Sequence, residues 1–186
     1  MSYCDNYATV TSSTAYTQSE TITITSTEAT TVTEKVFQTG SSVQVLGTYF
    51  SPNGGCAEQI IYWIGRANTS IHVLIYSFTL QNIADALIDA KNRGVDVKVV
   101  FEKGQISKYS QYFRLASAGV SVRNDTNPDY MHNKVAIIDG IIVLTGSYNW
   151  SSSAENSNNE NLIIVKSADV AREYENVFNR IWENGR

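Results

Sequence analysis

From residue 43 onward the sequence alternates between apolar runs of strand length and longer segments with apolar residues at helical spacing. The predicted strands span residues 43–50, 71–78, 95–101, 120–123, 135–138, 141–144 and 161–166. The predicted helices span residues 56–67, 81–93, 107–118 and 168–182. β-Branched residues dominate several of these strands, as they do in sheets that are covered on both faces. The alternation therefore predicts an α/β fold in which a mixed β-sheet is sandwiched by helices.

Residues 1–40 differ in composition from the rest of the chain. Between residues 9 and 33, fifteen of twenty-five residues are Ser or Thr, so this stretch buries too little apolar area to offset its ordering entropy. We expect a Ser/Thr-rich tail or linker over residues 1–40 and one folded domain over residues 41–186. The alternating stretch at residues 21–25 could also add to a sheet edge.

The tail is similar to the stalks that join a leader or membrane anchor to an extracellular domain. It therefore favours an extracellular or cell-surface location, with a cytoplasmic location as the alternative. No apolar run is long enough to span a bilayer, and residues 1–5 lack the features of a signal peptide. Either the protein stays where it is made, or a leader or anchor has been removed.

The formal net charge of −4, taken alone, argues against a nucleic-acid partner. Residues 36–186, however, hold fourteen acidic and thirteen basic residues and are nearly neutral. Seven basic residues lie between positions 91 and 123, namely Lys91, Arg93, Lys98, Lys103, Lys108, Arg114 and Arg123. A local basic strip of this kind can bind phosphates, although each of these residues fits a solvated surface equally well.

Two cysteines are too few for a disulfide scaffold. A bridge between Cys4 and Cys56 would pin the tail to the domain, and two free thiols are the alternative. Two histidines and two cysteines also give no spacing typical of a zinc site. We therefore expect neither a metal nor another cofactor.

The region between residues 132 and 149 gathers side chains that can perform phosphate chemistry. His132 and Lys134 are two residues apart beside a predicted strand, so their side chains should point to the same face. Asp139 follows that strand, and Ser147 and Asn149 follow the next one. An imidazole and a cation aimed at one small volume suit a phosphate, because the imidazole attacks phosphorus while the cation holds the oxygens.

This ordered pattern, His-x-Lys-x4-Asp-x6-Gly-Ser-x-Asn, resembles the HKD signature of the phospholipase D superfamily. Within that superfamily, the segments 76–79, 93–99 and 149–151, Met131 and the pair at 160–161 resemble the small Nuc-type endonucleases. The resemblance runs from about residue 43 to residue 182. It implies a phospholipase D/Nuc-like fold and a metal-independent phosphodiesterase that forms a covalent phosphohistidine.

The resemblance also implies a role for each polar residue of the motif. His132 would be the nucleophile, and Lys134 and Asn149 would hold the nonbridging oxygens of the phosphate. Ser147 would add a hydrogen bond. Donors of this kind typically contribute about 3–4 kcal/mol each to lowering the barrier.

Two carboxylates are expected to support these residues. Glu160 matches the position from which a carboxylate bonds the far nitrogen of the histidine, fixing its tautomer and stabilising the imidazolium. Asp139 is expected to have a supporting role. It lies at the end of a strand, and its side chain could stabilise the turn that follows. The other histidine, His72, has no lysine two residues on and is expected to be structural.

A single copy of the motif has a consequence for assembly. One histidine cannot easily be both the nucleophile and the acid that protonates the leaving oxygen on the opposite side of phosphorus. The chain carries one copy, so the resemblance implies that it is active as a homodimer with a two-fold interface. His132 of each subunit would then flank one phosphorus atom.

The leading functional prediction is a non-specific endonuclease that acts on DNA, or on RNA, and leaves a 5′-phosphate. The alternative is a phospholipase D or cardiolipin-type lipid hydrolase that uses the same residues. A lipid hydrolase is expected to have an apolar entrance to its site or a membrane-facing segment. Neither is visible within residues 43–186. A third class, an inactive homologue that only binds nucleic acid or assembles through its Thr-rich tail, is disfavoured by the intact motif.

Overall fold

The computed structural model describes residues 42–186, which contain one seven-stranded mixed sheet. Its strands are β1 (Gln44–Ser51), β2 (Ser70–Ile75), β3 (Asp96–Phe101), β4 (Ser121–Asn124), β5 (Lys134–Ile138), β6 (Ile142–Gly146) and β7 (Glu160–Lys166). Across the sheet the strands follow the order β1-β7-β6-β5-β2-β3-β4. β2, β3 and β4 are parallel, and the other neighbours are antiparallel. The predicted mixed sheet is confirmed.

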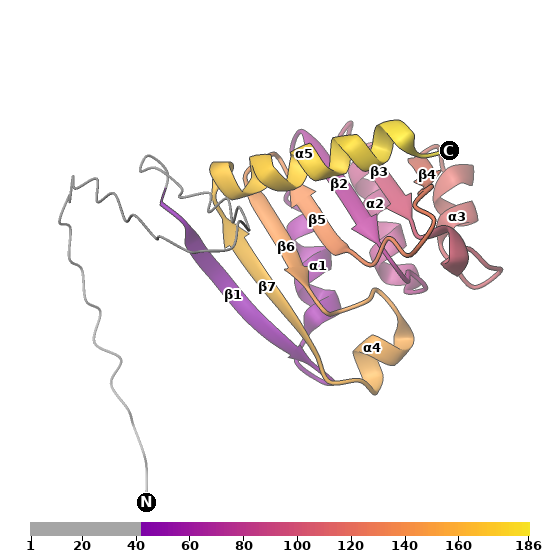
Figure 1. Ribbon diagram of the computed structural model, residues 1–186. Helices are drawn as coiled ribbons and strands as arrows, with labels where there is room; N and C mark the ends of the chain where they lie inside the picture. Colours follow the sequence, from indigo (N-terminus) through magenta and orange to yellow (C-terminus); the bar gives the residue numbers. More distant parts are fainter. Residues whose placement is uncertain (1–41) are drawn as a thin grey trace, which may run out of the picture. The chain divides into compact units, whose positions relative to one another are not determined.

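Helices cover both faces of this sheet. They are α1 (Cys56–Ile64), α2 (Gln81–Asn92), α3 (Tyr112–Ser117), α4 (Ser152–Asn156) and α5 (Ala168–Asn184). Figure 1 shows α5 lying across one face, while α1 and α2 lie behind the strands on the other. One buried apolar cluster fills each interface, so the predicted sandwich of sheet and helices is also confirmed.

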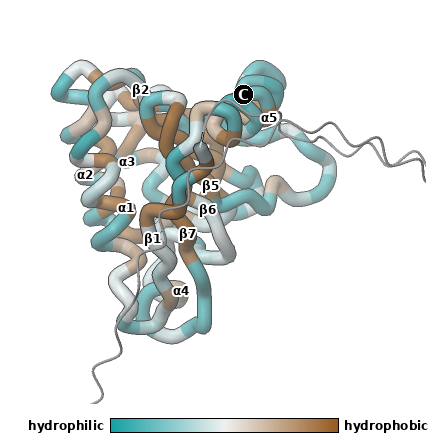
Figure 2. The backbone as a smooth tube through the Cα atoms, turned by 90° about the vertical axis from the view of Figure 1, so that its left-hand side faces the viewer, coloured by the Kyte–Doolittle hydropathy of each residue, from teal (hydrophilic) through white to brown (hydrophobic). Residues whose placement is uncertain are grey.

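The helices bury the apolar faces that their sequences predict. Ile60 and Ile64 of α1 are fully buried, as are Ile83 and Leu87 of α2. Phe178 of α5 is fully buried against the opposite face of the sheet. In Figure 2 the hydrophobic residues concentrate in the central strands, whereas α5 carries many hydrophilic residues. Each fully buried side chain of this size stabilises the fold by about 1.5–3 kcal/mol.

One predicted helix, over residues 107–118, is shorter in the structure and forms only at Tyr112–Ser117. The loop before it is held by serine hydroxyls: Ser110 Oγ accepts from Ser107 N, and Ser107 Oγ accepts from Tyr109 N. Such side-chain bonds give the backbone an alternative to helical hydrogen bonds. α4 was not predicted, and it starts where the Ser151 hydroxyl caps Ala154 N.

The predicted tail over residues 1–40, its strand-like piece at 21–25, and Cys4 lie outside the described residues. Cys56 itself is a free thiol, fully buried at the start of α1. Burial raises the pKa of the Cys56 thiol to about 11, which keeps it in the unreactive protonated form. Within residues 42–186, none of the helices combines the length and apolar character needed to cross a membrane.

Candidate active site

The motif residues come together where three neighbouring strands, β5, β6 and β7, begin or end. β5 begins at Lys134, antiparallel β6 ends beside it at Gly146, and β7 begins at Glu160. The register pairs Val135 with Thr145 across β5 and β6. A cavity of about 280 Å³ opens at these strand ends. It is lined by His132, Lys134, Gly146, Ser147, Asn149 and Glu160. Five of the six predicted site residues therefore share one cavity.

Lys134 is the buried cation of this cavity, with only 7% of its surface exposed. Its Nζ lies 2.9 Å from Nδ1 and 3.1 Å from Nε2 of His132, and it donates to the His132 carbonyl at 2.8 Å. Burial lowers the pKa of Lys134, and the negative charge of Glu160 partly opposes this. An ammonium that donates to the imidazole requires an unprotonated ring nitrogen, which is also the nucleophilic form.

Tyr76 holds the His132 ring from the side. The two ring centroids are 4.3 Å apart, and the Lys134 Nζ lies 4.9 Å from the Tyr76 centroid. Tyr76 directly follows β2, whose last residue, Ile75, pairs with Lys134 across the sheet. The sequence alone does not place Tyr76 in the site, because its contact with His132 follows from the order of the strands in the sheet. The signal that could have found it is the aromatic residue at the end of a strand.

Asn149 and Ser147 are oriented by bonds to their neighbours. Asn149 Oδ1 accepts from Ser77 N at 3.2 Å, which leaves its amide N–H groups to donate into the cavity. Ser147 Oγ accepts from the backbone N of Asn161 at 3.1 Å and from its Nδ2 at 3.2 Å. Its hydroxyl proton is then available to a phosphate oxygen. Both side chains thus present donors at the place where the predicted phosphate would lie.

Gly146 is required by the close packing beneath this loop. Its φ is +151°, and a Cβ at this position would lie 2.2 Å from the Asn161 carbonyl oxygen. A larger residue would push β6 away from the start of β7 and displace Ser147. The glycine of the motif therefore acts through the backbone.

Glu160 lines the cavity, but its carboxylate accepts from Asn158 Nδ2 at 3.1 Å. Among the residues that the structure describes, it makes no hydrogen bond to His132, since Lys134 lies beside both ring nitrogens. Its effect in this arrangement is electrostatic, because its charge favours the ammonium form of Lys134. The predicted contact between Glu160 and the imidazole stays a prediction.

Asp139 is the one predicted site residue that the structure does not bring to the cavity. It lies at the opposite end of β5, where its carboxylate accepts from the backbone N–H groups of Asn68, Thr69 and Ser70 at 2.8–3.1 Å. The Thr69 hydroxyl donates as well, at 2.9 Å. Burial opposes ionisation, but these hydrogen bonds outweigh it and hold the pKa of Asp139 below its usual value. Asp139 therefore fixes the start of β2 against the end of β5.

We expect Asp139→Asn to destabilise the fold by about 1–2 kcal/mol at neutral pH. The folded-state pKa is lowered, so the carboxylate contributes stability that is complete above about pH 4. This contribution is lost as the pH falls further, because the unfolded carboxyl takes up its proton first. Urea denaturation between pH 2.5 and 7 gives the free energy of unfolding at each pH. At acid pH this free energy should fall less steeply in Asp139→Asn than in the exposed control Asp89→Asn. Identical curves for the two variants would contradict this role.

Glu102 is a second residue that supports the site from a distant strand. It is fully buried after β3, and its carboxylate accepts from Met131 N at 2.7 Å and from Gly104 N at 2.9 Å. Met131 directly precedes His132, so this carboxylate fixes the backbone on which the imidazole is carried. Because Glu102 has neither an unusual neighbour nor a motif around it, its sequence gives no signal of this role.

Replacing Glu102 by glutamine should place an amide N–H group against one of these two backbone donors. We expect a loss of about 2–3 kcal/mol in the free energy of unfolding, because a buried charge-assisted hydrogen bond is lost. Guanidinium denaturation measures this loss. A variant as stable as the wild type would show that Glu102 does not hold the segment before His132.

His72 and the predicted basic strip lie outside the site. His72 Nδ1 bonds Glu175 at 2.7 Å, and its ring stacks on Phe178 at 4.5 Å, so the structural role expected for it is confirmed. None of the seven basic residues between positions 91 and 123 lines the cavity. Five of them donate hydrogen bonds within the chain, namely Arg93, Lys98, Lys103, Arg114 and Arg123, and Lys108 lies over the Tyr109 ring. They serve the fold in this structure.

Comparison with known proteins shows which family the chain belongs to. A family model described as cardiolipin synthase, PLD-like domain, matches residues 60–182. Phospholipase D of Rickettsia prowazekii is 37% identical over 137 residues, which cover 73% of this chain and 67% of that protein. Mitochondrial cardiolipin hydrolase of Xenopus tropicalis is 37% identical over 127 residues, which cover 68% of this chain. The match spans 60% of the length of the frog protein.

The solved structure of Nuc, a phospholipase D family member from Salmonella typhimurium, is also similar. It superimposes with a TM-score of 0.72 and 34% identity, covering 79% of this chain and 97% of Nuc. The chain thus belongs to the phospholipase D superfamily, whose members are phosphodiesterases. Its fold matches that of Nuc over nearly the whole length of that protein.

Proposed function

We propose that this protein is a metal-independent phosphodiesterase that cleaves nucleic acid, most simply as a non-specific endonuclease on DNA. The observation that carries the proposal is the cavity in which the Lys134 ammonium lies 2.9 Å from the His132 ring, beside the donors Ser147 and Asn149. A nucleophile surrounded by a cation and two neutral donors suits a phosphodiester anion. The similarity to Nuc supports nucleic acid as the molecule that carries this phosphodiester.

In the proposed first step, a ring nitrogen of His132 attacks phosphorus and forms a P–N bond. The P–O bond to the leaving nucleoside oxygen breaks, and that oxygen takes a proton from His132 of the partner subunit. Lys134, Asn149 and Ser147 hold the nonbridging oxygens while negative charge develops on them. Each of these donors would lower the barrier by about 3–4 kcal/mol.

In the second step, water attacks the phosphohistidine. His132 of the partner subunit, now neutral, takes the proton from this water, and the P–N bond breaks. The product is a phosphate monoester, and the resemblance to Nuc-type endonucleases supports the 5′ end as its position. Glu160 would stabilise the imidazolium that forms during this cycle, once substrate draws Lys134 away from the ring.

The lipid hydrolase is the second candidate, and the names of the Rickettsia and frog relatives favour it. The same attack on phosphorus would then release a headgroup or a phosphatidyl group. Against it stands the polar lining of the cavity, where every residue except Gly146 contributes a polar side chain. An acyl chain entering this space would remove those groups from water without replacing their hydrogen bonds.

Plasmid, single-stranded oligonucleotides and cardiolipin vesicles, each incubated with the protein in EDTA, separate these functions. The proposal predicts nicking and oligonucleotide cleavage that EDTA does not prevent and that His132→Asn abolishes. His72→Asn, which replaces the other histidine outside the cavity, should remain active once folding has been verified by circular dichroism. Cleavage of vesicles alone would favour the lipid hydrolase, and dependence on an added metal would refute metal independence.

A further inference from the structure

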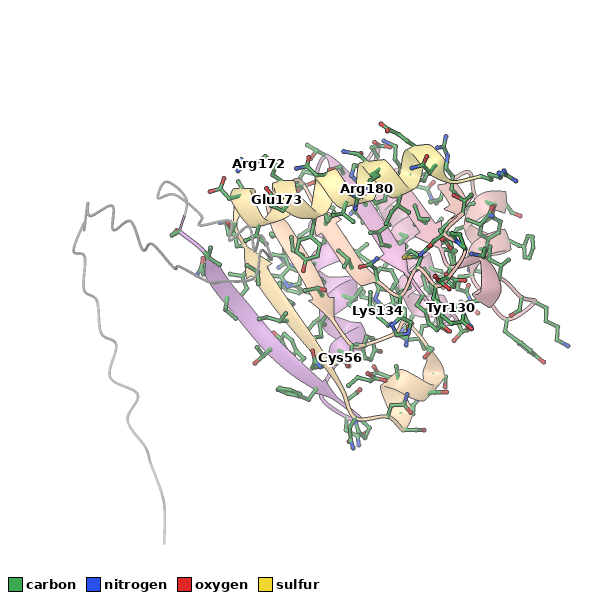
Figure 3. All side chains as sticks on the ribbon, in the orientation of Figure 1. Cys56, Tyr130, Lys134, Arg172, Glu173 and Arg180 are labelled. Atoms are coloured by element: carbon green, nitrogen blue, oxygen red, sulfur yellow. The ribbon has the colours of Figure 1, made fainter. Side chains whose placement is uncertain are left out.

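A second cavity, of about 400 Å³, lies on the other side of the segment that carries His132. It is lined by the loop before β5 and by the last turns of α5, including Asn127, Tyr130, Asn133, Arg180 and Asn184. Asn133 stands between His132 and Lys134, and neighbouring side chains of an extended segment point in opposite directions. The backbone of residues 132–134 therefore lies between the two cavities. Figure 3 shows Tyr130 near Lys134, with Arg180 on α5 above them.

Arg180 is the cation of this second cavity, whose lining also includes Asp125, a buried carboxylate that accepts from Lys103 N and Asn127 N. Arg172, nearer the start of the same helix, pairs with Asp169 at 2.6 Å. None of the ion pairs formed within residues 42–186 includes Arg180, and its side chain is exposed. A guanidinium without an internal partner is suited to hold a phosphate from outside the protein.

Tyr130 gives the cavity an aromatic surface that is held in place. Its side chain is 67% exposed, yet its ring packs edge-on against Tyr76, with centroids 5.9 Å apart and an interplanar angle of 89°. Tyr76 in turn contacts His132 at 4.3 Å. An exposed ring in a fixed orientation is a platform on which an unpaired nucleobase can stack.

The amide of Asn133 completes the polar lining. Asn127 and Asn184 use their amide nitrogens on the carbonyls of Tyr130 and Arg180. The Asn133 side chain makes no hydrogen bond within the part of the chain that the structure describes, although its backbone oxygen accepts from Tyr76 N. An amide carries both donors and an acceptor, which match the edges of nucleobases.

From these features we propose that the second cavity is a nucleotide subsite for single-stranded nucleic acid. It would bind the nucleotide next to the scissile phosphate, with the base on Tyr130, its edge toward Asn133 and its phosphate on Arg180. A base inside a duplex is stacked on its neighbours and cannot reach such a ring, so the subsite favours unpaired strands. This inference rests on the proposed nuclease function, because it assumes that His132 attacks a nucleic-acid phosphodiester.

The test compares a single-stranded oligonucleotide with bis(p-nitrophenyl) phosphate, a diester too small to reach both cavities. Arg180→Ala should lower the ratio of kcat/KM on the oligonucleotide to kcat/KM on the small diester about tenfold. The matched control, Arg172→Ala, removes the same side chain from the same helix and should keep the wild-type ratio. The salt dependence of log kcat/KM on the oligonucleotide should become shallower by about 0.7 in Arg180→Ala only, as for one lost phosphate contact.

The aromatic platform has its own pair of variants. Tyr130→Leu should lower the same ratio by about tenfold, whereas Tyr130→Phe retains a ring and should restore it. Equal ratios in Arg180→Ala and Arg172→Ala, or equal losses in Tyr130→Leu and Tyr130→Phe, would overturn the subsite while leaving the nuclease function standing. A wild-type protein that cleaves cardiolipin vesicles but no oligonucleotide would overturn both.

Discussion

Replacing His132 by asparagine will reduce phosphodiester cleavage by about 10⁴-fold or more, because the proposed nucleophile is removed. The exposed His132 ring lies at the mouth of the cavity, so its loss should change the free energy of unfolding by less than about 1 kcal/mol. The measurement is the rate of bis(p-nitrophenyl) phosphate hydrolysis, with urea denaturation run in parallel.

His72→Asn is the control for this variant. It replaces a histidine that bonds Glu175 and packs on Phe178, so its effect should fall on stability. A His132→Asn protein that keeps more than a few per cent of the wild-type rate would contradict the role of His132 as nucleophile. Loss of activity together with loss of folding would be equally inconsistent with the exposed position of this ring.

Lys134→Met will have the second largest effect, a loss of about 10²–10³-fold in kcat, because the fixed cation facing the phosphate disappears. The free energy of unfolding, in contrast to kcat, should stay the same or rise in Lys134→Met. The pKa of Lys134 is lowered by burial, so the folded state disfavours the charged form that is present at neutral pH. A methionine of similar shape has no such cost, and the variant should be at least as stable as the wild type.

The same shift sets the alkaline limit of activity. In the proposed mechanism the ammonium holds the phosphate, so kcat should fall as the pH rises through the lowered pKa of Lys134, below the ordinary value for lysine of about 10.4. Stability should rise over the interval between the folded and unfolded pKa values, because the unfolded state then binds more protons. Lys166→Met, at the far exposed end of β7, is the matched control and should change neither profile.

Lys134→Arg adds a test of shape. The buried ammonium contacts the His132 ring and carbonyl within 3.1 Å, and the larger planar guanidinium does not fit this arrangement. We expect its kcat to remain at least tenfold below that of the wild type. Full activity in Lys134→Arg would show that charge alone is sufficient at this position.

Local sequence patterns were sufficient to predict the mixed sheet, four of the five α-helices within residues 42–186 and most of the cavity. The reason is that His132, Lys134, Ser147 and Asn149 lie on one antiparallel pair of strands or directly beside it, so their proximity follows from a short turn. Even Glu160 starts the next strand of this meander. Spacing along the chain therefore translates directly into spacing in the cavity.

Residues that reach the site from distant strands could not be found in this way. Tyr76 and Glu102 follow β2 and β3, and they meet the segment before β5 only because β2 pairs with β5 and β3 lies beside β2. Arg180 comes from the last helix. Apolar periodicity predicts that these strands and helices exist, but it does not determine their order across the sheet.

Asp139 shows the opposite limitation. Its place in the motif suggested a contact with the site, yet one strand length separates the two ends of β5, and Asp139 is at the end away from Lys134. Its four donors come from residues 68–70, about seventy positions earlier in the chain. A motif records which residues occur together, and some of them act by holding the strands that carry the others.

The shared site is the central proposal, and a hybrid dimer tests it most directly. Two differently tagged chains, one wild type and one His132→Asn, can be co-expressed and the mixed dimer purified through both tags. If His132 from each subunit flanks one phosphorus atom, the hybrid keeps a nucleophile but lacks the acid for the leaving oxygen, so its rate will fall at least about 10²-fold below that of the wild type. A hybrid with half of the wild-type rate, or a wild-type protein that is active as a monomer, would contradict the account.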